Sequence, residues 1–395
     1  SLIYKNPIIN SGNSTLTITD LSPSKNGSVT STNEAKTKPT VQNDSGSTLI
    51  VDGGLISSIY IAVANYGTMT VNNGTISSTE GTREAACAGQ NNGTLNVFNG
   101  EIKAIDENST EYGYSAIKNS GTSNIYGGTI TAQGKSGTSA IGYSYGSRAN
   151  IYSGNISATS SNDRATAVNA GHVLVAKSPD YPDLPEATIT AKGKRATGVD
   201  GSSNSNIDAG NITVTATETT GSNSAIGVSG LKTMSGGTVT VNSYTEAKGV
   251  SGYQNYEITG GTINVTSTSA NAYGIYTDNT YSDHYTEKIS GATVNATATA
   301  DGKLGEAIYI PSHRSAIITS GTYIGSAYGL YVASPDTNRT VTIGTKDNVF
   351  NNGYDDELLL TIRGEVYGAY GGHIYFYDGQ LQGGKSAYYD RNIKG

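Results

Sequence analysis

The sequence is poor in cysteine, in charge and in long apolar runs, and each shortage excludes a class of protein. Its 395 residues include one cysteine, Cys87, so the chain cannot form an internal disulfide. No apolar run reaches the roughly 18 residues of a membrane-spanning helix, so we expect no membrane insertion of this segment. Lysine and arginine number 25 against 32 acidic residues and form no basic run. Because nucleic-acid binding depends mainly on neutralised phosphates, we expect no nucleic-acid partner.

Apolar material is also scarce, but it is regularly placed. Hydrophobic residues make up 35% and charged residues 14% of the chain, against roughly 45–50% and 25% in ordinary globular domains. A disordered chain would be equally polar but poor in isoleucine, valine and tyrosine, whereas this chain has 28 tyrosines. The composition therefore predicts an ordered structure that needs little apolar material per residue.

A short unit recurs along the chain: an apolar residue, two small or polar residues, glycine, a polar residue and a second apolar residue. Ile125–Ile130 and Ile258–Ile263 are two copies. The central glycine marks each copy, at Gly54, Gly74, Gly100, Gly128, Gly154, Gly210, Gly237, Gly261, Gly321, Gly353 and Gly379, with Ala187 and Ala292 in two further copies. Successive markers lie about 27 residues apart, which is typical of a solenoid repeat.

Two apolar columns flank this marker. The first lies three residues before it and comprises Val51, Val71, Val97, Ile125, Ile151, Leu184, Ile207, Met234, Ile258, Ile289, Ile318, Phe350 and Phe376. The second lies two residues after it and comprises Ile56, Ile76, Ile102, Ile130, Ile156, Ile189, Ile212, Val239, Ile263, Val294, Tyr323 and Leu381, with a break at Asp355. An odd separation would place the columns on opposite sides of one straight strand. We therefore expect the glycine to mark a corner that turns both columns toward the core.

A second unit follows in each repeat, in which a small residue precedes alanine or glycine and then an aliphatic residue. Its copies include Ser115–Ile117, Ser139–Ile141, Thr166–Val168, Ser224–Ile226 and Glu306–Ile308. Three short strands per repeat predict an all-β fold, a single-stranded parallel β-helix (solenoid) of about 13 rungs, and parallel crossovers predict its right hand. We assign residues 47–395 to this helix as one continuous domain, and residues 1–46 to an N-terminal cap or degenerate first rungs.

Polar residues occupy the positions that should face outward. A ladder dominated by threonine adjoins the second column, at Thr75, Glu101, Thr129, Asn155, Thr188, Asn211, Thr238, Thr262, Thr293 and Thr322. Threonine is β-branched and suits a pleated surface. Asn124, Asn150 and Asn206 each precede an inward isoleucine, and we expect them to stack at a turn.

The units Thr48–Ile56 and Thr68–Ile76 resemble repeats of bacterial adhesin-like surface proteins, which have a pectin-lyase-like right-handed parallel β-helix. The resemblance extends from about residue 47 to the end of the chain. It implies a secreted or wall-attached protein that serves as a stalk or a ligand-binding passenger. It implies no particular ligand and no cofactor.

β-Helices also include polysaccharide hydrolases, whose motifs have partial counterparts in the same order. These counterparts are Thr277-Asp278, Asp355-Asp356, Gly372-His373 and the pair Arg391 and Lys394. Tyr276 stands in place of the family's asparagine, and Ile374 in place of its second glycine. Asp278 and Asp355 are about three rungs apart, some 14 Å, whereas glycoside hydrolysis needs carboxylates roughly 5–9.5 Å apart. We therefore predict no catalytic residues, and the four histidines show no metal-ligand spacing.

Tyrosines recur at fixed positions late in the chain. Tyr273, Tyr328, Tyr367 and Tyr388 occupy one site of the repeat, and Tyr276, Tyr331 and Tyr370 follow at an offset of three. Long repeats at residues 177–183 and 278–285 predict protruding loops, which often gather on a binding face. The candidate ligand-binding residues are therefore Tyr273, Tyr276, Asp278, Tyr281, Tyr285, Tyr328, Tyr331, Tyr367 and Tyr370. The alternative is aromatic packing that covers the end of the solenoid.

Together these patterns favour an extracellular, adhesin-like surface protein that binds or displays without catalysis. A glycan or a host surface protein is the expected partner, because stacked tyrosines offer amphipathic surface at low entropy cost. A polysaccharide-cleaving enzyme and a phage tail-spike-like receptor-binding protein remain as alternatives. The sequence contains no leader peptide, and we expect targeting and anchoring segments to lie outside it.

Overall fold

The computed structural model describes residues 2–4, 7–22, 26–31, 38–79, 87–106, 114–142, 146–219, 225–253, 255–278, 285–311, 314–333, 340–344 and 360–389, without the side chains of 2–4, 87 and 88. The chain divides into two compact units, unit 1 (Ser1–Asn204) and unit 2 (Ser205–Gly395). Each unit is described by itself below.

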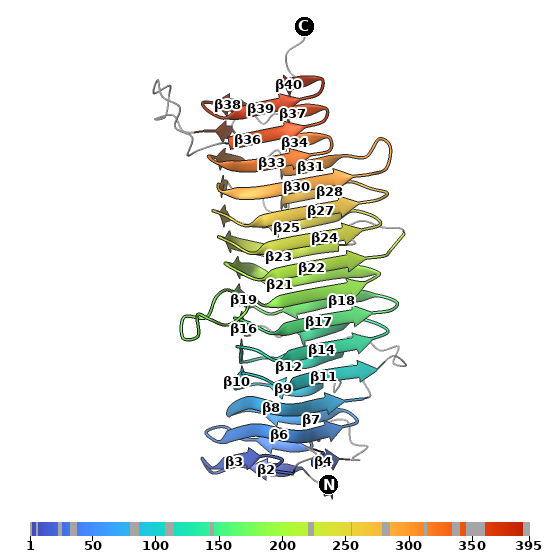
Figure 1. Ribbon diagram of the computed structural model, residues 1–395, viewed down its shortest axis with the longest axis vertical. Helices are drawn as coiled ribbons and strands as arrows, with labels where there is room; N and C mark the ends of the chain where they lie inside the picture. The colour runs from blue at the N-terminus through green and yellow to red at the C-terminus, as the bar shows by residue number, and fades with distance from the viewer. Residues whose placement is uncertain are drawn as a thin grey trace. The chain divides into compact units, whose positions relative to one another are not determined.

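The fold is a right-handed parallel β-helix with three strands per rung, as the sequence predicts. Each strand pairs in parallel with the strand one rung before it and one rung after it, so successive rungs coil upon one another (Figure 1). The strands lie on three faces. The first face carries the column before the glycine marker, the second face carries the column after it, and the third face carries the alanine-aliphatic unit.

In unit 1, two long strands run through the first and second faces, β6 (Thr48–Ser58) and β8 (Thr68–Ser78). The other first-face strands are β3 (Thr15–Ile18), β10 (Thr94–Val97), β13 (Thr122–Ile125), β16 (Arg148–Ile151) and β19 (His172–Val175). The other second-face strands are β1 (Leu2–Tyr4), β4 (Ser28–Ser31), β11 (Glu101–Asp106), β14 (Thr129–Gly134), β17 (Asn155–Ser160) and β20 (Thr188–Gly193). The third-face strands are β2 (Ile8–Asn10), β5 (Val41–Asn43), β7 (Ile61–Asn65), β9 (Cys87–Asn91), β12 (Tyr114–Asn119), β15 (Thr138–Gly142), β18 (Arg164–Asn169) and β21 (Arg195–Ile207), of which β21 continues into the first face and has its last three residues in unit 2.

In unit 2, β23 (Ala225–Met234) runs through the third and first faces. The other first-face strands are β26 (Glu257–Ile258), β29 (Thr286–Ile289), β32 (Ser315–Ile318), β35 (Val341–Ile343) and β38 (Ile374–Phe376). The second-face strands are β22 (Asn211–Ala216), β24 (Thr238–Ser243), β27 (Thr262–Ser267), β30 (Ala292–Ala298), β33 (Gly321–Gly325), β36 (Leu360–Gly364) and β39 (Gln380–Gly383). The other third-face strands are β25 (Ala247–Gly252), β28 (Ala272–Thr277), β31 (Gly305–Ile310), β34 (Tyr328–Val332), β37 (Tyr367–Tyr370) and β40 (Ser386–Tyr389).

The glycine marker is a corner, as predicted from the odd separation of the two columns. In β6 the pairing register shifts at Asp52, and Gly54 has a φ of 73°. A left-handed backbone at this point turns both flanking residues inward, because the bulge resets the alternation of the strand. Val51 and Ile56 are therefore both fully buried. Each such aliphatic side chain contributes about 1.5–3 kcal/mol by leaving water.

Two residues of the predicted first column are placed differently. Leu184 lies in a loop and is partly exposed, and the buried Val175 pairs with Ile151 in its place. The assignment of Leu184 is wrong because it assumed a fixed spacing to the marker, whereas an insertion at this corner lengthens it. Phe376 pairs with Ile343 as a first-column residue, but its side chain is 47% exposed.

A further insertion, after Ile343, explains the distorted copy at Gly353. Phe350, Gly353 and Asp355 lie outside the described residues. The first-column position of that rung belongs to Ile343, which pairs with Ile318, and the second-column position belongs to Ile362, which pairs with Tyr323. The break that the sequence showed at Asp355 is therefore absent from the core, because the chain returns to register after the insertion.

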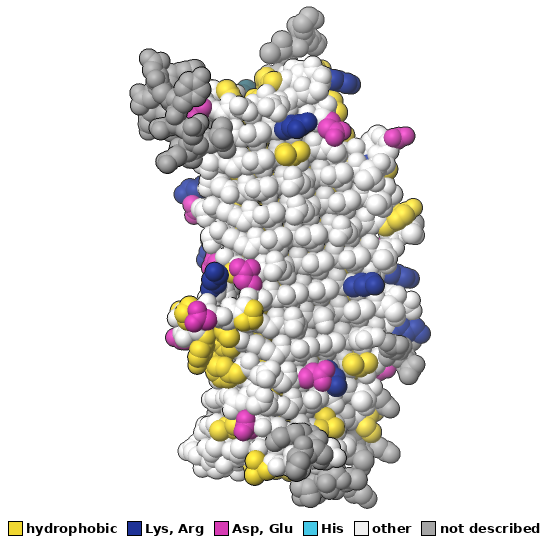
Figure 2. All heavy atoms as spheres, in the orientation of Figure 1, with side chains coloured by type: hydrophobic (Ala, Val, Ile, Leu, Met, Phe, Trp, Pro, Cys, Tyr) yellow, Lys and Arg dark blue, Asp and Glu magenta, His cyan; other side chains and the backbone are white. Residues whose placement is uncertain are grey.

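The outward columns are also aligned across rungs. In unit 2, Thr238, Thr262 and Thr293 stand in register on β24, β27 and β30, on a polar surface without charge that is uncoloured in Figure 2. In unit 1, Asn150 Nδ2 donates to Asn124 Oδ1 at 2.8 Å, which confirms the predicted stack. Asn206 does not belong to it and instead accepts a hydrogen bond from Thr233 Oγ1 at 2.8 Å.

A second asparagine ladder, which the sequence reasoning missed, lies inside unit 1. It occupies the ends of the first five third-face strands, at Asn10, Asn43, Asn65, Asn91 and Asn119. Each Nδ2 donates to the Oδ1 of the next asparagine, over 2.8–3.0 Å. All five residues are buried, and their amides also bond to backbone carbonyls of the following turn. This ladder therefore satisfies the polar groups at one corner of unit 1, as burial requires.

Candidate functional site

The predicted tyrosines form a two-column array on the outward side of the third face of unit 2. The main column comprises Tyr276, Tyr309, Tyr331, Tyr370 and Tyr389, one from each of β28, β31, β34, β37 and β40. Successive rings are parallel to within 6–13°, with centroids 5.0–5.7 Å apart. Parallel pairing of identical positions on adjacent rungs brings the rings to this separation, which suits aromatic stacking.

The side column lies three residues earlier on the same strands, at Tyr273, Tyr328 and Tyr367. Tyr328 and Tyr367 stack at 6.0 Å, and Tyr273 meets Tyr276 edge to face at 5.2 Å. Residues three apart would face opposite sides of a regular strand. In β28 the two intervening residues are both buried, so the strand bends and returns the second tyrosine to the outer side. We call the eight tyrosines of both columns the tyrosine array.

Two ionisable side chains also belong to the side column. Glu306 lies between two of its rings, and Lys248 lies beside the first ring. Glu306 pairs in register with Tyr273 on one rung and Tyr328 on the next, and only 2% of it is exposed. Its Oε2 has no hydrogen-bond partner among the described residues. Lys248 stands one rung before Tyr273, and its Nζ lies 3.7 Å from the centroid of the Tyr276 ring. A cation therefore covers the ring face at that end of the main column.

Burial sets the protonation of the array. It raises the pKa of Tyr273 to about 12, and together with the neighbouring Tyr309 it raises the pKa of Tyr276 further. Burial also raises the pKa of the Glu306 carboxyl to about 8. At neutral pH the phenols of Tyr273 and Tyr276 are therefore neutral hydrogen-bond donors and acceptors, and most of Glu306 is protonated.

The structure brings together six of the nine predicted site residues, all within the array. These six are Tyr273, Tyr276, Tyr328, Tyr331, Tyr367 and Tyr370. Asp278 lies near one end, where its charge acts on Lys248 and Tyr276. Tyr281 lies outside the described residues. Tyr285 is not part of the array.

Tyr388 was assigned to the side column, and that assignment is wrong. It pairs with Ala369, whereas Tyr389 pairs with Tyr370 and continues the main column. The error has a physical cause. Tyr388 and Tyr389 are adjacent, so only the register shows which ring stacks.

Sequence reasoning also missed Tyr309, Glu306 and Lys248. A signal for Tyr309 was present, because it follows Ile308 as Tyr276 follows Ile275 and Tyr331 follows Leu330. An aliphatic residue followed by tyrosine therefore marks the main column. A signal for Glu306 was also present, because Glu306–Ile308 is a copy of the second unit and places Glu306 at the site of Tyr273 and Tyr328. Lys248 occupies the same site one rung before Tyr273. Both were missed because they differ in type from the tyrosines in register with them.

Tyr285 belongs instead to a buried ionic cluster in unit 2. Its ring lies 4.6 Å from the Arg314 guanidinium carbon. Arg314 Nη1 donates to Glu287 Oε1 at 3.4 Å, and Nη2 donates to the Tyr253 carbonyl at 2.7 Å. The Arg314 and Glu287 side chains are fully buried. The other oxygen of Glu287 accepts from the Tyr256 backbone at 3.0 Å, so the cluster is held by several elements of its rungs.

Unit 1 has a smaller aromatic cluster at the corner beside residues 177–183, one of the predicted protruding loops. Phe98, Tyr126 and Tyr152 stack at 4.9 and 5.1 Å, and Tyr181 from the loop meets the first two edge to face. Figure 2 shows hydrophobic side chains gathered at this place. The second predicted loop, 278–285, lies outside the described residues over 279–284.

The partial hydrolase motifs lie apart from one another or outside the described residues. Thr277 is buried, and its hydroxyl is 2.7 Å from the Tyr256 hydroxyl. His373 lies in a turn between β37 and β38 with a φ of 51°. The remaining motif residues, Asp355, Asp356, Arg391 and Lys394, are not described.

In the described part of the chain, no three histidine, cysteine or acidic side chains come together in a way that could hold a metal ion. Nor do the described residues include a helix that could cross a membrane. Comparison of the chain with protein families, with curated proteins and with solved structures gave no match.

Proposed function

We propose that this chain is a non-catalytic, adhesin-like binding module of an extracellular surface protein, and that the tyrosine array binds its ligand. The observation that supports this proposal is the in-register stack of five tyrosines on the outer side of the third face. A glycan is the ligand class that the surface suits best, and a host surface protein is the competing class.

The core beneath the array is complete without the tyrosines. Ile275, Ile308 and Leu330 point inward from the same strands and are fully buried. The rings of Tyr276, Tyr309 and their neighbours are only partly buried. The fold alone would require only polar residues at these outward positions. The tyrosines therefore form a surface that the fold does not need.

The surface of the array is rigid, neutral and rich in hydroxyls. Because the rings stack face to face, they present their edges and phenol groups outward. The raised pKa of Tyr273 and of Tyr276 keeps these phenols protonated at neutral pH. A row of donors and acceptors repeated on every rung complements a linear chain of sugar hydroxyls, and fixed rings lose little entropy on binding.

The test is binding of the full chain to a printed array of oligosaccharides and to a panel of host surface proteins. The variant Tyr331→Ala removes the central ring, whereas Tyr331→Phe removes only its hydroxyl. Tyr126→Ala is the matched control, because Tyr126 is also stacked between two rings but lies in unit 1. We expect glycan binding to fall about tenfold or more in Tyr331→Ala, less in Tyr331→Phe, and not at all in the control.

Two results would contradict the proposal. If every glycan that the parent chain binds is bound equally well by Tyr331→Ala, the array is not the site. Release of reducing sugar from a bound polysaccharide would show a polysaccharide-cleaving enzyme. Binding to a host protein with loss in Tyr331→Ala would keep the site and change the ligand class.

A further inference from the structure

A corner of unit 1 changes its turn length between neighbouring rungs. The turns after β2 and β5 span residues 11–14 and 44–47, whereas the turn after β7 is only residues 66–67. The short turn lies against the long one, since a Cβ on Gly67 would meet the carbonyl oxygens of Asp44 and Ser47. The two long turns therefore project farther than the short turn and form a step in the surface. Tyr66, the first residue of the short turn, lies at the base of this step.

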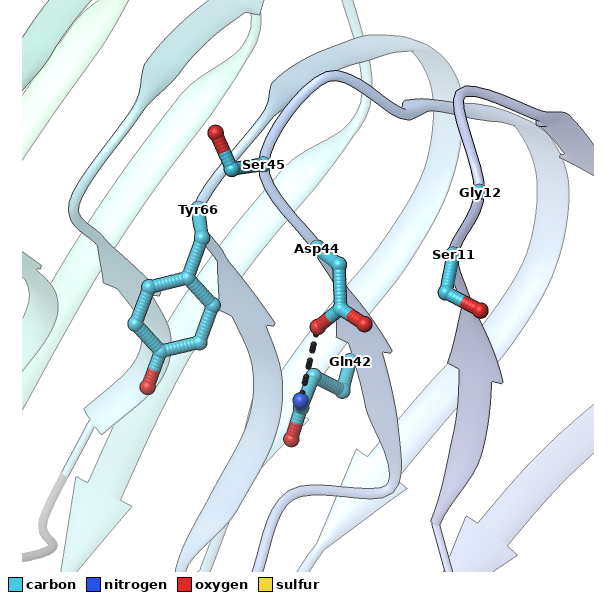
Figure 3. Close-up of a pocket in the computed structure, with 6 residues that line it drawn as sticks. All are labelled: Ser11, Gly12, Gln42, Asp44, Ser45 and Tyr66. Atoms are coloured by element: carbon cyan, nitrogen blue, oxygen red, sulfur yellow. Dashed lines mark hydrogen bonds between the residues drawn. The ribbon is translucent and has the colours of Figure 1, made fainter.

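The step borders a shallow hollow of about 550 Å³ that is wide open to solvent. Its lining residues are Ser11, Gly12, Gln42, Asp44, Ser45 and Tyr66, all in unit 1 (Figure 3). A hollow of this size is within the range of small-ligand sites. Beneath it, the buried asparagine ladder joins the same three turns, because Asn10, Asn43 and Asn65 immediately precede them. The lining is therefore fixed by the interior of the unit.

The lining combines an aromatic ring with a carboxylate that forms no salt bridge with any described residue. Gln42 Nε2 donates to Asp44 Oδ1 at 2.7 Å, which orients the carboxylate beside the Tyr66 ring (Figure 3). Within the described ranges, no Lys, Arg or His nitrogen lies within 4.0 Å of Asp44. Tyr66 is 43% exposed, and none of the described aromatic rings stacks on it.

We propose that this hollow is a binding site for a neutral saccharide, separate from the tyrosine array. A carboxylate held by an amide can accept further hydrogen bonds from sugar hydroxyls, and Gln42 and Ser45 supply both donors and acceptors. The exposed ring of Tyr66 offers an apolar platform for the C–H face of a pyranose. Asp44 repels carboxylates, so uronic and sialic acids are excluded.

The test uses the full chain and a printed array of neutral oligosaccharides of glucose, galactose and N-acetylglucosamine, beside uronic-acid and sialic-acid counterparts and a hexalysine peptide. Tyr66→Ala and Asp44→Asn are the site variants. Tyr244→Ala is the matched control, because Tyr244 is 46% exposed and lies in unit 2. Tyr331→Ala separates this site from the array, and hydrogen exchange at β5 and β7 checks that each variant is folded.

We expect one or more neutral saccharides to bind and to lose about tenfold in affinity in Tyr66→Ala and in Asp44→Asn. Binding of the same saccharides should be unchanged in Tyr244→Ala and in Tyr331→Ala. The proposal is overturned if no neutral saccharide signal falls in Tyr66→Ala. It is equally overturned if hexalysine is the only probe whose binding Asp44→Asn weakens, because the hollow would then be a site for cations.

Discussion

The two units fill the same inward columns with the same aliphatic residues but differ in their other columns. Unit 1 buries a ladder of asparagines whose amides donate to one another and to the adjoining turns. Unit 2 places a stack of tyrosines on its outer side and buries four ionisable side chains, Lys248, Glu287, Glu306 and Arg314. The same repeated core therefore accommodates a buried asparagine ladder in unit 1 and an outward stack of tyrosines in unit 2.

The difference shows which repeated columns hold the fold and which offer a surface. The asparagine ladder is closed, because each side-chain amide finds its partners inside the unit. The tyrosine array is open, because the phenols of its main column face outward and the Glu306 Oε2 has no partner among the described residues. Inward repetition explains stability, and the outward repetition of aromatic residues is the feature on which the proposed binding site rests.

The strongest test of this contrast compares one ion pair from each unit. Arg314→Met leaves Glu287 buried without its cation, so we expect the free energy of unfolding of unit 2 to fall by about 3–5 kcal/mol. Arg195→Met is the matched control in unit 1, where Arg195 Nη2 lies 2.6 Å from Asp163 Oδ1 but the arginine is 38% exposed. There we expect a loss of at most about 1 kcal/mol.

Urea unfolding followed by circular dichroism measures both variants, and hydrogen exchange assigns the loss to a unit. In a second variant, Arg314→Met with Glu287→Gln, much of the lost stability should return, because no buried charge is left unpaired. Equal losses in Arg314→Met and Arg195→Met would show that burial makes no difference between the two pairs.

The next largest effect should come from the asparagine ladder of unit 1. Asn65→Ala removes the acceptor of Asn43 and the donor to Asn91, so we expect a loss of about 2–3 kcal/mol, since buried groups are left unpaired. Asn124→Ala, in the partly exposed stack, should cost under about 1 kcal/mol, because water replaces the lost partner. Urea unfolding measures both. A cost for Asn65→Ala as small as that for Asn124→Ala would mean that water reaches the ladder.

Most of the fold was predictable from the sequence, because the repeat shows which side chains face inward. The columns at Val51 and Ile56 predicted the corner glycine, and the structure confirms both. The assignments of Leu184 and of the copy at Gly353 failed where insertions lengthen the corner. A spacing rule cannot distinguish an inserted loop from a new strand when both contain an apolar residue.

The candidate site was predictable only in part. The offset of three between Tyr273 and Tyr276 predicted two tyrosine columns, but it could not show which adjacent tyrosine, Tyr388 or Tyr389, continues the stack. The hollow beside Tyr66 was missed because it depends on the turns of neighbouring rungs, which the pattern of a single rung does not describe. Glu306 was missed although its place in the second unit aligns it with Tyr273 and Tyr328, because a carboxylate does not continue a pattern of tyrosines.

Glu306 should make the stability of unit 2 depend on pH. Its folded pKa is about 8, raised by burial, so between about pH 5 and 8 the folded state holds a proton that the unfolded state has lost. Stability is then greatest at low pH and falls as the pH rises, by up to about 1 kcal/mol per pH unit, and levels off above about pH 8.

Urea unfolding at a series of pH values measures this slope. Glu306→Gln should make it shallower and should stabilise unit 2 above about pH 8, since that carboxylate then no longer has to ionise in a buried place. Burial also raises the pKa of Glu287, so a smaller slope should remain. Glu257→Gln, at an exposed position of β26, is the control and should leave the full slope in place. A slope as steep in Glu306→Gln as in the parent chain would assign the pH dependence to another group.

The smallest expected effect separates the two explanations of the tyrosine array. Tyr309 stacks on Tyr276 at 5.0 Å and on Tyr331 at 5.7 Å. If the array exists for a ligand, Tyr309→Leu should lower the free energy of unfolding by only about 1 kcal/mol, while glycan binding falls about tenfold. If the array only covers the end of the solenoid, the stability loss should be several times larger and binding should not change. Tyr309→Phe, which keeps the stack, should preserve stability in either case, so any binding that it loses belongs to the hydroxyl.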